Sequence, residues 1–296
     1  MPDAAGPATT LAIIAGRGSL PREIAERRAE AGLPYLLIVY QGCFESWMAA
    51  HPHQHHEFER VGAMFRALRA ADVTHVVFAG GMNRPRVRFH RVDLKGVTVA
   101  AKALTLLRRG DDAMLRGFSA IFESEGITLI GPQEILGQGM TVAPGPLTTA
   151  EPAADDRRDA ARAAEIVAAL GPLDVGQGAV VARGVCLAVE AVEGTDLMLM
   201  RVAKLPPERR ASAAPPSGVL FKGPKPDQDH RLDMPAIGPA TLEAAAAAGL
   251  NGIVVAADRT VLIEADATRE AARQSGLFVY GVTPEQLADW QAATGD

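Results

Sequence analysis

Apolar and polar positions along the first half of the chain predict strands that alternate with helices. Short apolar runs typical of buried strands lie at residues 11–15, 35–40, 75–79 and 128–130. Helical spacing of apolar residues covers residues 61–71, 97–107 and 113–125, and a further helix follows the first strand and ends near Gly32. Because this alternation favours a parallel sheet covered on both faces, we predict an N-terminal Rossmann-like α/β domain.

A stretch rich in proline and glycine, residues 137–152, interrupts the pattern and is typical of a linker. Beyond it, the pattern predicts helices at 155–170, 196–202 and 241–248 and strands at 178–181, 185–191, 219–222, 252–255 and 261–264. We therefore expect two domains, the N-terminal one over residues 1–148 and a mixed α/β C-terminal one over residues 149–296. The chain length agrees with domains of roughly 150 residues each.

The net charge of −5 argues against one class of partner. A mildly acidic chain has no overall attraction to nucleic acid or to an anionic bilayer, so we expect no nucleic-acid partner. An anionic ligand must then be held locally, by chosen basic residues, helix N-termini or a metal.

The cellular compartment is predicted from apolar runs, the N-terminal sequence and the cysteines. No run approaches the roughly 18 uninterrupted apolar residues of a membrane span, and the N-terminus does not resemble a secretory signal. Cys43 and Cys186 are both flanked by apolar sequence and are expected to be buried free thiols, which fit a reducing compartment. We expect a cytoplasmic protein whose contact with a membrane is peripheral.

The loop after the first predicted strand, AGRGSLP at residues 15–21, joins glycines to a helix start. Glycines let the backbone approach a phosphate, and a helix N-terminus offers free N–H groups with partial positive charge. A plain tight turn explains the loop equally well. A dinucleotide site is disfavoured, because Pro21 replaces the third glycine of the fingerprint and Tyr40-Gln41-Gly42 brings no acid for a ribose.

A second loop, at residues 80–86, follows the third predicted strand and begins with Gly80 and Gly81. It is crowded by the arginines at positions 84, 86 and 88, whose planar guanidinium groups match phosphate oxygens. A solvated basic loop is the alternative. Ligands of parallel sheets bind beyond the carboxyl ends of the strands, where this loop lies, and we therefore favour a phosphate-binding role.

In the C-terminal half, acids and cations alternate between prolines over residues 222–235. Its charged members include Asp227, Asp229, Asp233, Lys222, Lys225 and Arg231. Carboxylate oxygens are ligands that Mg²⁺ prefers, and neighbouring cations neutralise phosphate charge during transfer. The run thus predicts a Mg²⁺ site beside a phosphate, with a plain surface loop as the alternative.

Several other polar features are weaker. The run His51–His56 is interpreted as a solvated loop rather than a metal site, because metal ligands come from separated, rigid positions. Asp111 is expected to cap a helix, as is Thr195 or Asp196. Glu190 and Glu193 either reach the site or serve in caps and turns, and the sequence favours neither interpretation. The Gly110-Asp111 pair also occurs in calcineurin-type phosphoesterases. That class is excluded, because it also requires an Asp-x-His pair and a Gly-Asn-His stretch, and the chain contains neither.

Taken together, the motifs resemble the LpxI-type UDP-2,3-diacylglucosamine pyrophosphatases of lipid A biosynthesis. The resemblance covers nearly the whole chain in order and is carried by AGRGSLP (15–21), FAGGMNRP (78–85), GDDAMLR (110–116), LDVGQGAVV (173–181), AVEGTDLMLMR (191–201) and KPDQDHRLDMPAIGPAT (225–241). Asp227 and His230 fall at variable places of the family pattern, which weakens Asp227 as a site residue.

The resemblance implies Mg²⁺-dependent hydrolysis of UDP-2,3-diacylglucosamine to UMP and 2,3-diacylglucosamine 1-phosphate (lipid X), with water attacking the phosphorus next to the sugar. It implies a cleft between two domains, peripheral contact with the inner membrane, and Asp229 as the catalytic and metal-binding position, with Asp233 second. A homodimer is left open, and so is a non-catalytic nucleotide-sugar-binding protein as the alternative function.

Within the matching motifs we expect the following residues to contact the substrate: Gly16, Gly18, Ser19, Leu20, Gly80, Gly81, Arg84, Thr195, Lys225, Gln228 and Arg231. The acyl chains require an apolar surface in addition. Its candidates, each of which is also expected as ordinary core, are Leu104, Leu107, Met114, Leu197 and Met200.

Overall fold

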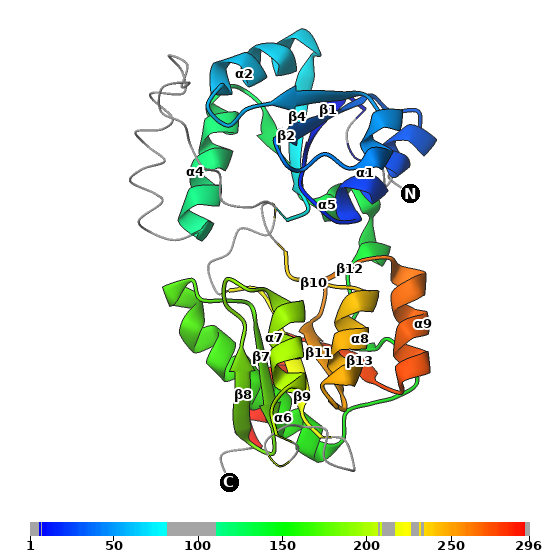
Figure 1. The fold of residues 1–296 in the computed structure, drawn as a ribbon, viewed down its shortest axis with the longest axis vertical. Coiled ribbons are helices and arrows are strands. Elements are labelled where there is room, and N and C mark those ends of the chain that lie inside the picture. Colours follow the sequence, from blue (N-terminus) through cyan, green and yellow to red (C-terminus); the bar gives the residue numbers. More distant parts are fainter. Residues whose placement is uncertain are drawn as a thin grey trace. The chain divides into compact units, whose positions relative to one another are not determined.

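The computed structural model describes residues 6, 8–81, 111–206, 208, 217–225, 231 and 234–293. It divides into two compact units, of which the first comprises Met1–Gly137 with Asp229–Asp233 and the second comprises Gln138–Gln228 with Met234–Asp296. The helix expected at residues 97–107 lies outside the described residues. Both units are α/β, as the sequence predicts (Figure 1).

The first unit is built on a five-stranded parallel sheet of order β3-β2-β1-β4-β5. Its strands are β1 (Thr10–Ala15), β2 (Tyr35–Tyr40), β3 (His53–His56), β4 (Val73–Ala79) and β5 (Thr128–Leu129). The chain leaves β1 toward β2 and β3 on one side and then returns to place β4 and β5 on the other. The order of strands therefore reverses between β1 and β4.

Helices cover both faces of this sheet (Figure 1). They are α1 (Leu20–Glu30), α2 (Val61–Ala70), α4 (Asp111–Ser124) and α5 (Pro132–Leu136), with a short 3-10 helix, η1, at Ser46–Ala50. Successive residues of β1 point to opposite faces: Ile13 packs with α1 and α5, whereas Ile14 packs with α2 and α4. Because both faces are covered, β1 is apolar at every position but its first.

The histidine-rich run forms the edge strand β3, so the interpretation of this run as a solvated loop was wrong. β3 pairs in parallel with β2, and the backbone N–H of Leu37 donates to the carbonyl of Pro52 at 2.8 Å. An edge strand with partly exposed side chains carries no apolar alternation, which explains why the pattern missed it.

The second unit contains a six-stranded sheet of order β6-β13-β11-β9-β7-β8. Its strands are β6 (Gly145–Pro146), β7 (Gly178–Ala182), β8 (Val185–Val189), β9 (Val219–Lys222), β11 (Gly252–Ala256) and β13 (Phe278–Val282). Strands β9, β11 and β13 are parallel, while β6, β7 and β8 are antiparallel to their neighbours. A separate two-stranded sheet pairs β10 (Ala236–Ile237) with β12 (Val261–Leu262).

Two helical layers enclose the larger sheet (Figure 1). One layer contains α7 (Thr195–Ala203), α8 (Pro239–Ala247) and α9 (Ala265–Ser275), and the other contains α6 (Ala154–Leu170) and α10 (Pro284–Ala292). Along β9, Phe221 packs with α6, and Leu220 packs with α7 and α8. The sequence pattern did not predict α9, β13 and α10.

Much of the stretch interpreted as a linker, residues 137–152, belongs to the second unit. Its β6 pairs with β13, Thr141 forms a β-bridge with Val261, and Val142 is buried in the core beside α7 and α8. The units divide after Gly137, earlier than the expected boundary at residue 148. Prolines and glycines there serve an irregular edge strand, which resembles a linker in composition.

Two further expectations concern cysteines and membranes. Cys43 is a buried free thiol as expected, but Cys186 is exposed, because it lies on the edge strand β8 of the second sheet. Among the described residues, no helix has the length and apolar composition of a membrane-spanning segment.

Candidate active site

The two glycine loops of the first unit meet at the carboxyl ends of β1 and β4, where the strand order reverses. Backbone hydrogen bonds join them: the N–H of Arg17 donates to the carbonyl of Gly81 at 2.9 Å, and the N–H of Gly81 donates back at 3.0 Å. In open parallel sheets this reversal point is the usual ligand site. The structure thus brings together those predicted residues of the two loops that it describes, which are Gly16, Gly18, Ser19, Leu20, Gly80 and Gly81.

Glycine is sterically required where the loops touch. A Cβ atom at Gly16 would lie 2.6 Å from the carbonyl carbon of Gly80, and one at Gly80 would overlap the carbonyl oxygen of Arg17. Gly18 has a φ of +103°, a conformation that other residues rarely adopt. The motif therefore maintains close backbone packing at the edge of the sheet, in addition to any role toward a ligand.

An acidic residue that the sequence motifs did not indicate lies against the first loop. The N–H of Gly18 donates to Oε1 of Glu45 at 3.2 Å, and the indole N–H of Trp47 donates to Oε2 of the same carboxylate at 2.9 Å. Ser19 precedes α1 without a side-chain capping bond. A loop N–H that binds a carboxylate oxygen can also bind a phosphate oxygen, since both are anionic acceptors.

Several predicted residues lie outside the described part of the chain. They are Arg84, Gln228, Asp229 and Asp233. Arg231 is described and groups with the first unit, where it forms an ion pair with Glu123 of α4 at 3.4 Å. Its predicted contact with a substrate stays a prediction.

In the second unit, the side chains of Lys222, Thr195 and Glu190 meet at one end of the strands of the larger sheet. Gly178 at the start of β7 pairs with Lys222 at the end of β9, and the N–H of Glu190, just past β8, donates to the carbonyl of Gly178 at 2.9 Å. Along β9, Lys222 lies on the same side as Leu220, which is the side covered by α7. Thr195, the first residue of α7, completes the group.

These side chains form a hydrogen-bonded chain. Nζ of Lys222, a residue only 8% exposed, donates to Oγ1 of Thr195 at 2.5 Å. Oγ1 of Thr195 donates in turn to Oε1 of Glu190 at 2.9 Å. Gly194 rather than Thr195 is the N-cap of α7, so the expectation of a capping role for Thr195 was wrong. The Thr195 hydroxyl belongs instead to a buried charged network.

A second cation at the same strand end is also paired. Nζ of Lys225 contacts Oδ1 of Asp174, and both side chains are largely buried. Asp196, on α7, accepts a hydrogen bond from Oγ1 of Thr241 at 3.4 Å and is otherwise exposed. The sequence motifs contained Asp174 and Lys222 but did not distinguish either from its neighbours, because burial and pairing arise only when the strands come together.

The structure does not test the metal prediction. Within the described residues there is no group of three or more His, Cys, Asp or Glu side chains able to hold a metal ion. The carboxylates predicted to do so, Asp229 and Asp233, are outside that part of the chain. The histidines of β3 are among the described residues and form no such group.

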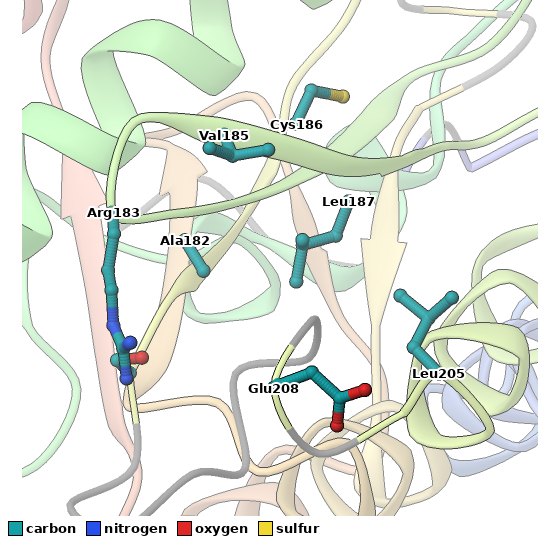
Figure 2. A pocket seen from close by; sticks show the side chains of 8 residues that line it. Ala182, Arg183, Val185, Cys186, Leu187, Leu205 and Glu208 are labelled. Atoms are coloured by element: carbon teal, nitrogen blue, oxygen red, sulfur yellow. The ribbon is translucent and has the colours of Figure 1, made fainter.

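A cavity of about 490 Å³ lies at the opposite end of β7 and β8, around the turn that joins them. Figure 2 shows Leu187 and Leu205 directed toward it, while the Cys186 side chain points the other way. Since β7 runs from Gly178 to Ala182, this cavity and the Lys222 end of the sheet lie at opposite ends of that strand. Among the described residues that line it, none is a predicted site residue.

The fold and the site define a class of proteins with two α/β units. The first unit has glycine loops at the point where the strand order reverses, and the second has largely buried lysines at the end of a strand. Within that class, the chain belongs to the LpxI family. The model of the LpxI N-terminal domain matches residues 10–138, and the model of the LpxI C-terminal domain matches residues 143–280. A relative from Caulobacter vibrioides, UDP-2,3-diacylglucosamine pyrophosphatase LpxI, is 41% identical over 276 residues, which cover 93% of this chain and 98% of the relative.

Proposed function

We propose that the chain hydrolyses the pyrophosphate of UDP-2,3-diacylglucosamine to UMP and 2,3-diacylglucosamine 1-phosphate, a step of lipid A biosynthesis. The observation that carries this proposal is the 41% identity to the Caulobacter vibrioides enzyme along 98% of that enzyme's length. The family matches, at residues 10–138 and 143–280, include both glycine loops, Lys222 and Lys225.

The hydrogen-bond donors and cations of each unit support a pyrophosphate ligand. The first unit presents backbone N–H groups at the glycine loop, one of which binds the Glu45 carboxylate. The second presents Lys222 and Lys225 at the end of β9. Because neither unit alone supplies both sets of groups, we propose that both contribute to binding.

The proposed reaction is attack by water on the phosphorus next to the sugar, with UMP leaving together with the bridging oxygen. The lysines stabilise negative charge on the phosphate oxygens, which is worth most where water is excluded. Asp229 and Asp233 are proposed to hold Mg²⁺, which would supply charge neutralisation and a fixed position for the pyrophosphate.

Two apolar side chains on α7 are proposed to help bind the acyl chains. Leu197 is 55% exposed and Met200 is 49% exposed, so the expectation that they are ordinary core was wrong. Both lie on the helix that begins with Thr195, next to the polar edge. Apolar side chains exposed beside a site that binds a lipid-bearing sugar favour peripheral contact with the membrane that holds this lipid.

Product analysis in ¹⁸O-labelled water tests the proposal. The purified chain, incubated with UDP-2,3-diacylglucosamine and Mg²⁺, is expected to release UMP and 2,3-diacylglucosamine 1-phosphate in equal amounts. The label is expected in the lipid product, because the attacked phosphorus stays with the sugar. Label in UMP would contradict the point of attack, and binding without turnover would favour the alternative, a nucleotide-sugar-binding protein.

A further inference from the structure

Glu190 fits into the end of the larger sheet because two glycines leave room for it. A Cβ atom at Gly178 would lie 2.9 Å from Oε2 of Glu190, and one at Gly176 would overlap the Glu190 carbonyl oxygen. Gly178 therefore leaves room for the carboxylate of Glu190, and Gly176 leaves room for its backbone. A glutamate that occupies space left by two glycines is held in one place, whereas a surface carboxylate is mobile.

The direction of the hydrogen bonds in the chain is fixed by chemistry. An ammonium group only donates and a carboxylate only accepts, so the Thr195 hydroxyl accepts from Lys222 and gives its single hydrogen to Glu190. Thr195 therefore offers Lys222 only lone pairs, and the bond to Glu190 fixes the direction in which they point. The ammonium group of Lys222 is thereby held in one orientation.

Lys222 has capacity for a ligand. Its ammonium group carries three N–H donors, and within the described residues it donates to Thr195 alone. No carboxylate of a described residue forms an ion pair with it, unlike Lys225, which pairs with Asp174. A buried ammonium without a direct counter-charge is costly, and a phosphate oxygen would satisfy the remaining donors.

Both oxygens of the Glu190 carboxylate are enclosed. Its Oε2 atom is buried and has no hydrogen-bond partner among the described residues, and its Oε1 atom accepts from Thr195. A carboxylate so enclosed can neither take a proton from an attacking water nor bind a substrate hydroxyl directly. Its effect must pass through Thr195.

We propose that Glu190 is a positioning residue for the hydrolysis, holding Lys222 through Thr195 as an oriented ammonium that binds a phosphate oxygen of the substrate. The inference rests on the proposed function and adds a residue outside the charged run at residues 222–235. It predicts that the three side chains act as a unit rather than independently.

Steady-state kinetics of single and double variants test this role. Glu190→Gln keeps the shape but permits the amide to donate to Thr195, and kcat/KM is expected to fall about 10- to 100-fold, as when a hydrogen bond to a charged group is lost. Thr195→Ser is expected to remain at least about tenfold more active than Thr195→Val, which has no hydroxyl. The matched control, Glu193→Gln, alters a half-buried carboxylate that pairs with Arg201 at 2.9 Å and is expected to leave activity unchanged.

A double-variant cycle separates positioning from a merely structural role. In the Thr195→Val background, Glu190→Gln is expected to change kcat/KM by less than about twofold, because the path to Lys222 is already broken. Independent, multiplying losses would overturn the proposal, as would a Glu190→Gln variant as active as the original chain. If Glu190→Gln does not fold, equal activity of Thr195→Ser and Thr195→Val overturns it instead. An inactive original chain would contradict the proposed function rather than the role of Glu190.

Discussion

Gly16 and Gly80 are in backbone contact, and a Cβ atom on Gly16 would lie 2.6 Å from the carbonyl carbon of Gly80. The contact fastens the loop after β1 to the loop after β4 at the reversal point of the first sheet. The backbone of residues 16–17 and that of residues 80–81 therefore pack together, although these segments lie far apart in the sequence.

Gly16→Ala is expected to destabilise the first unit by about 1–3 kcal/mol, as overpacking commonly does, since backbone cannot yield as a flexible side chain would. Thermal unfolding measures the change. Gly81→Ala is the matched control for stability, because a Cβ atom there meets no described residue within 4 Å. Equal unfolding temperatures for the two variants would contradict the assigned contact.

The pair formed by Lys225 and Asp174 allows stability and binding to be separated. Lys225→Met is expected to cost about 3 kcal/mol of unfolding free energy, because it removes the ammonium group paired with a largely buried carboxylate. Adding Asp174→Leu is expected to recover most of that stability but not the activity, if Lys225 contacts a phosphate. Denaturant unfolding and UMP release, measured on both variants, check this. Recovery of activity together with stability would reduce Lys225 to a structural residue.

Asp229 is predicted to be the principal catalytic and metal-binding acid. Asp229→Ala is expected to lower kcat by about 10²-fold or more at unchanged unfolding temperature, because the charge it holds in place stabilises the transition state. Chelation of divalent metal is expected to abolish UMP release, and added Mg²⁺ to restore it. The control is Asp266→Ala, at a fully exposed carboxylate on α9. If kcat of Asp229→Ala stayed within about tenfold of the original value, the assignment of Asp229 to the site would be wrong.

Stability of the first unit is expected to fall on mild acidification. Burial lowers the pKa of His75 below its ordinary 6.5, opposed in part by Glu134 and reinforced by Arg28, and its Nδ1 lies 2.8 Å from the Thr74 hydroxyl and 3.2 Å from the Thr9 hydroxyl. Burial and the neighbouring His55 also lower the pKa of His56. The unfolded chain therefore takes up protons first, so stability is complete above about pH 6.5 and declines below it.

Unfolding temperatures at about pH 8 and about pH 5.5 measure this effect, in a range where ordinary carboxylates stay ionised. The decrease is expected to be smaller in His75→Gln than in the original chain. An identical decrease in both would assign the pH dependence to other groups.

Local pattern alone was enough to predict most of the framework. β1, β2, β4 and β9 are apolar runs because each is covered on two faces, and strands of that kind are recognisable without knowledge of their neighbours. The glycine loops were predicted at the carboxyl ends of β1 and β4 for the same reason, since parallel strands end at one edge. Residues whose role depends on a contact between distant segments were not predicted from the pattern.

Tertiary structure decided which polar residues act together. Lys222 lies 27 positions from Thr195 in the sequence, and only the pairing of β9 with β7 and the packing of α7 bring them within hydrogen-bonding distance. The histidine run forms strand β3 because it pairs with β2, and residues 145–146 form strand β6 because they pair with β13. Hydrogen-bond partners and burial are properties of the assembled fold, since they depend on which segments meet, and a linear pattern carries no record of that.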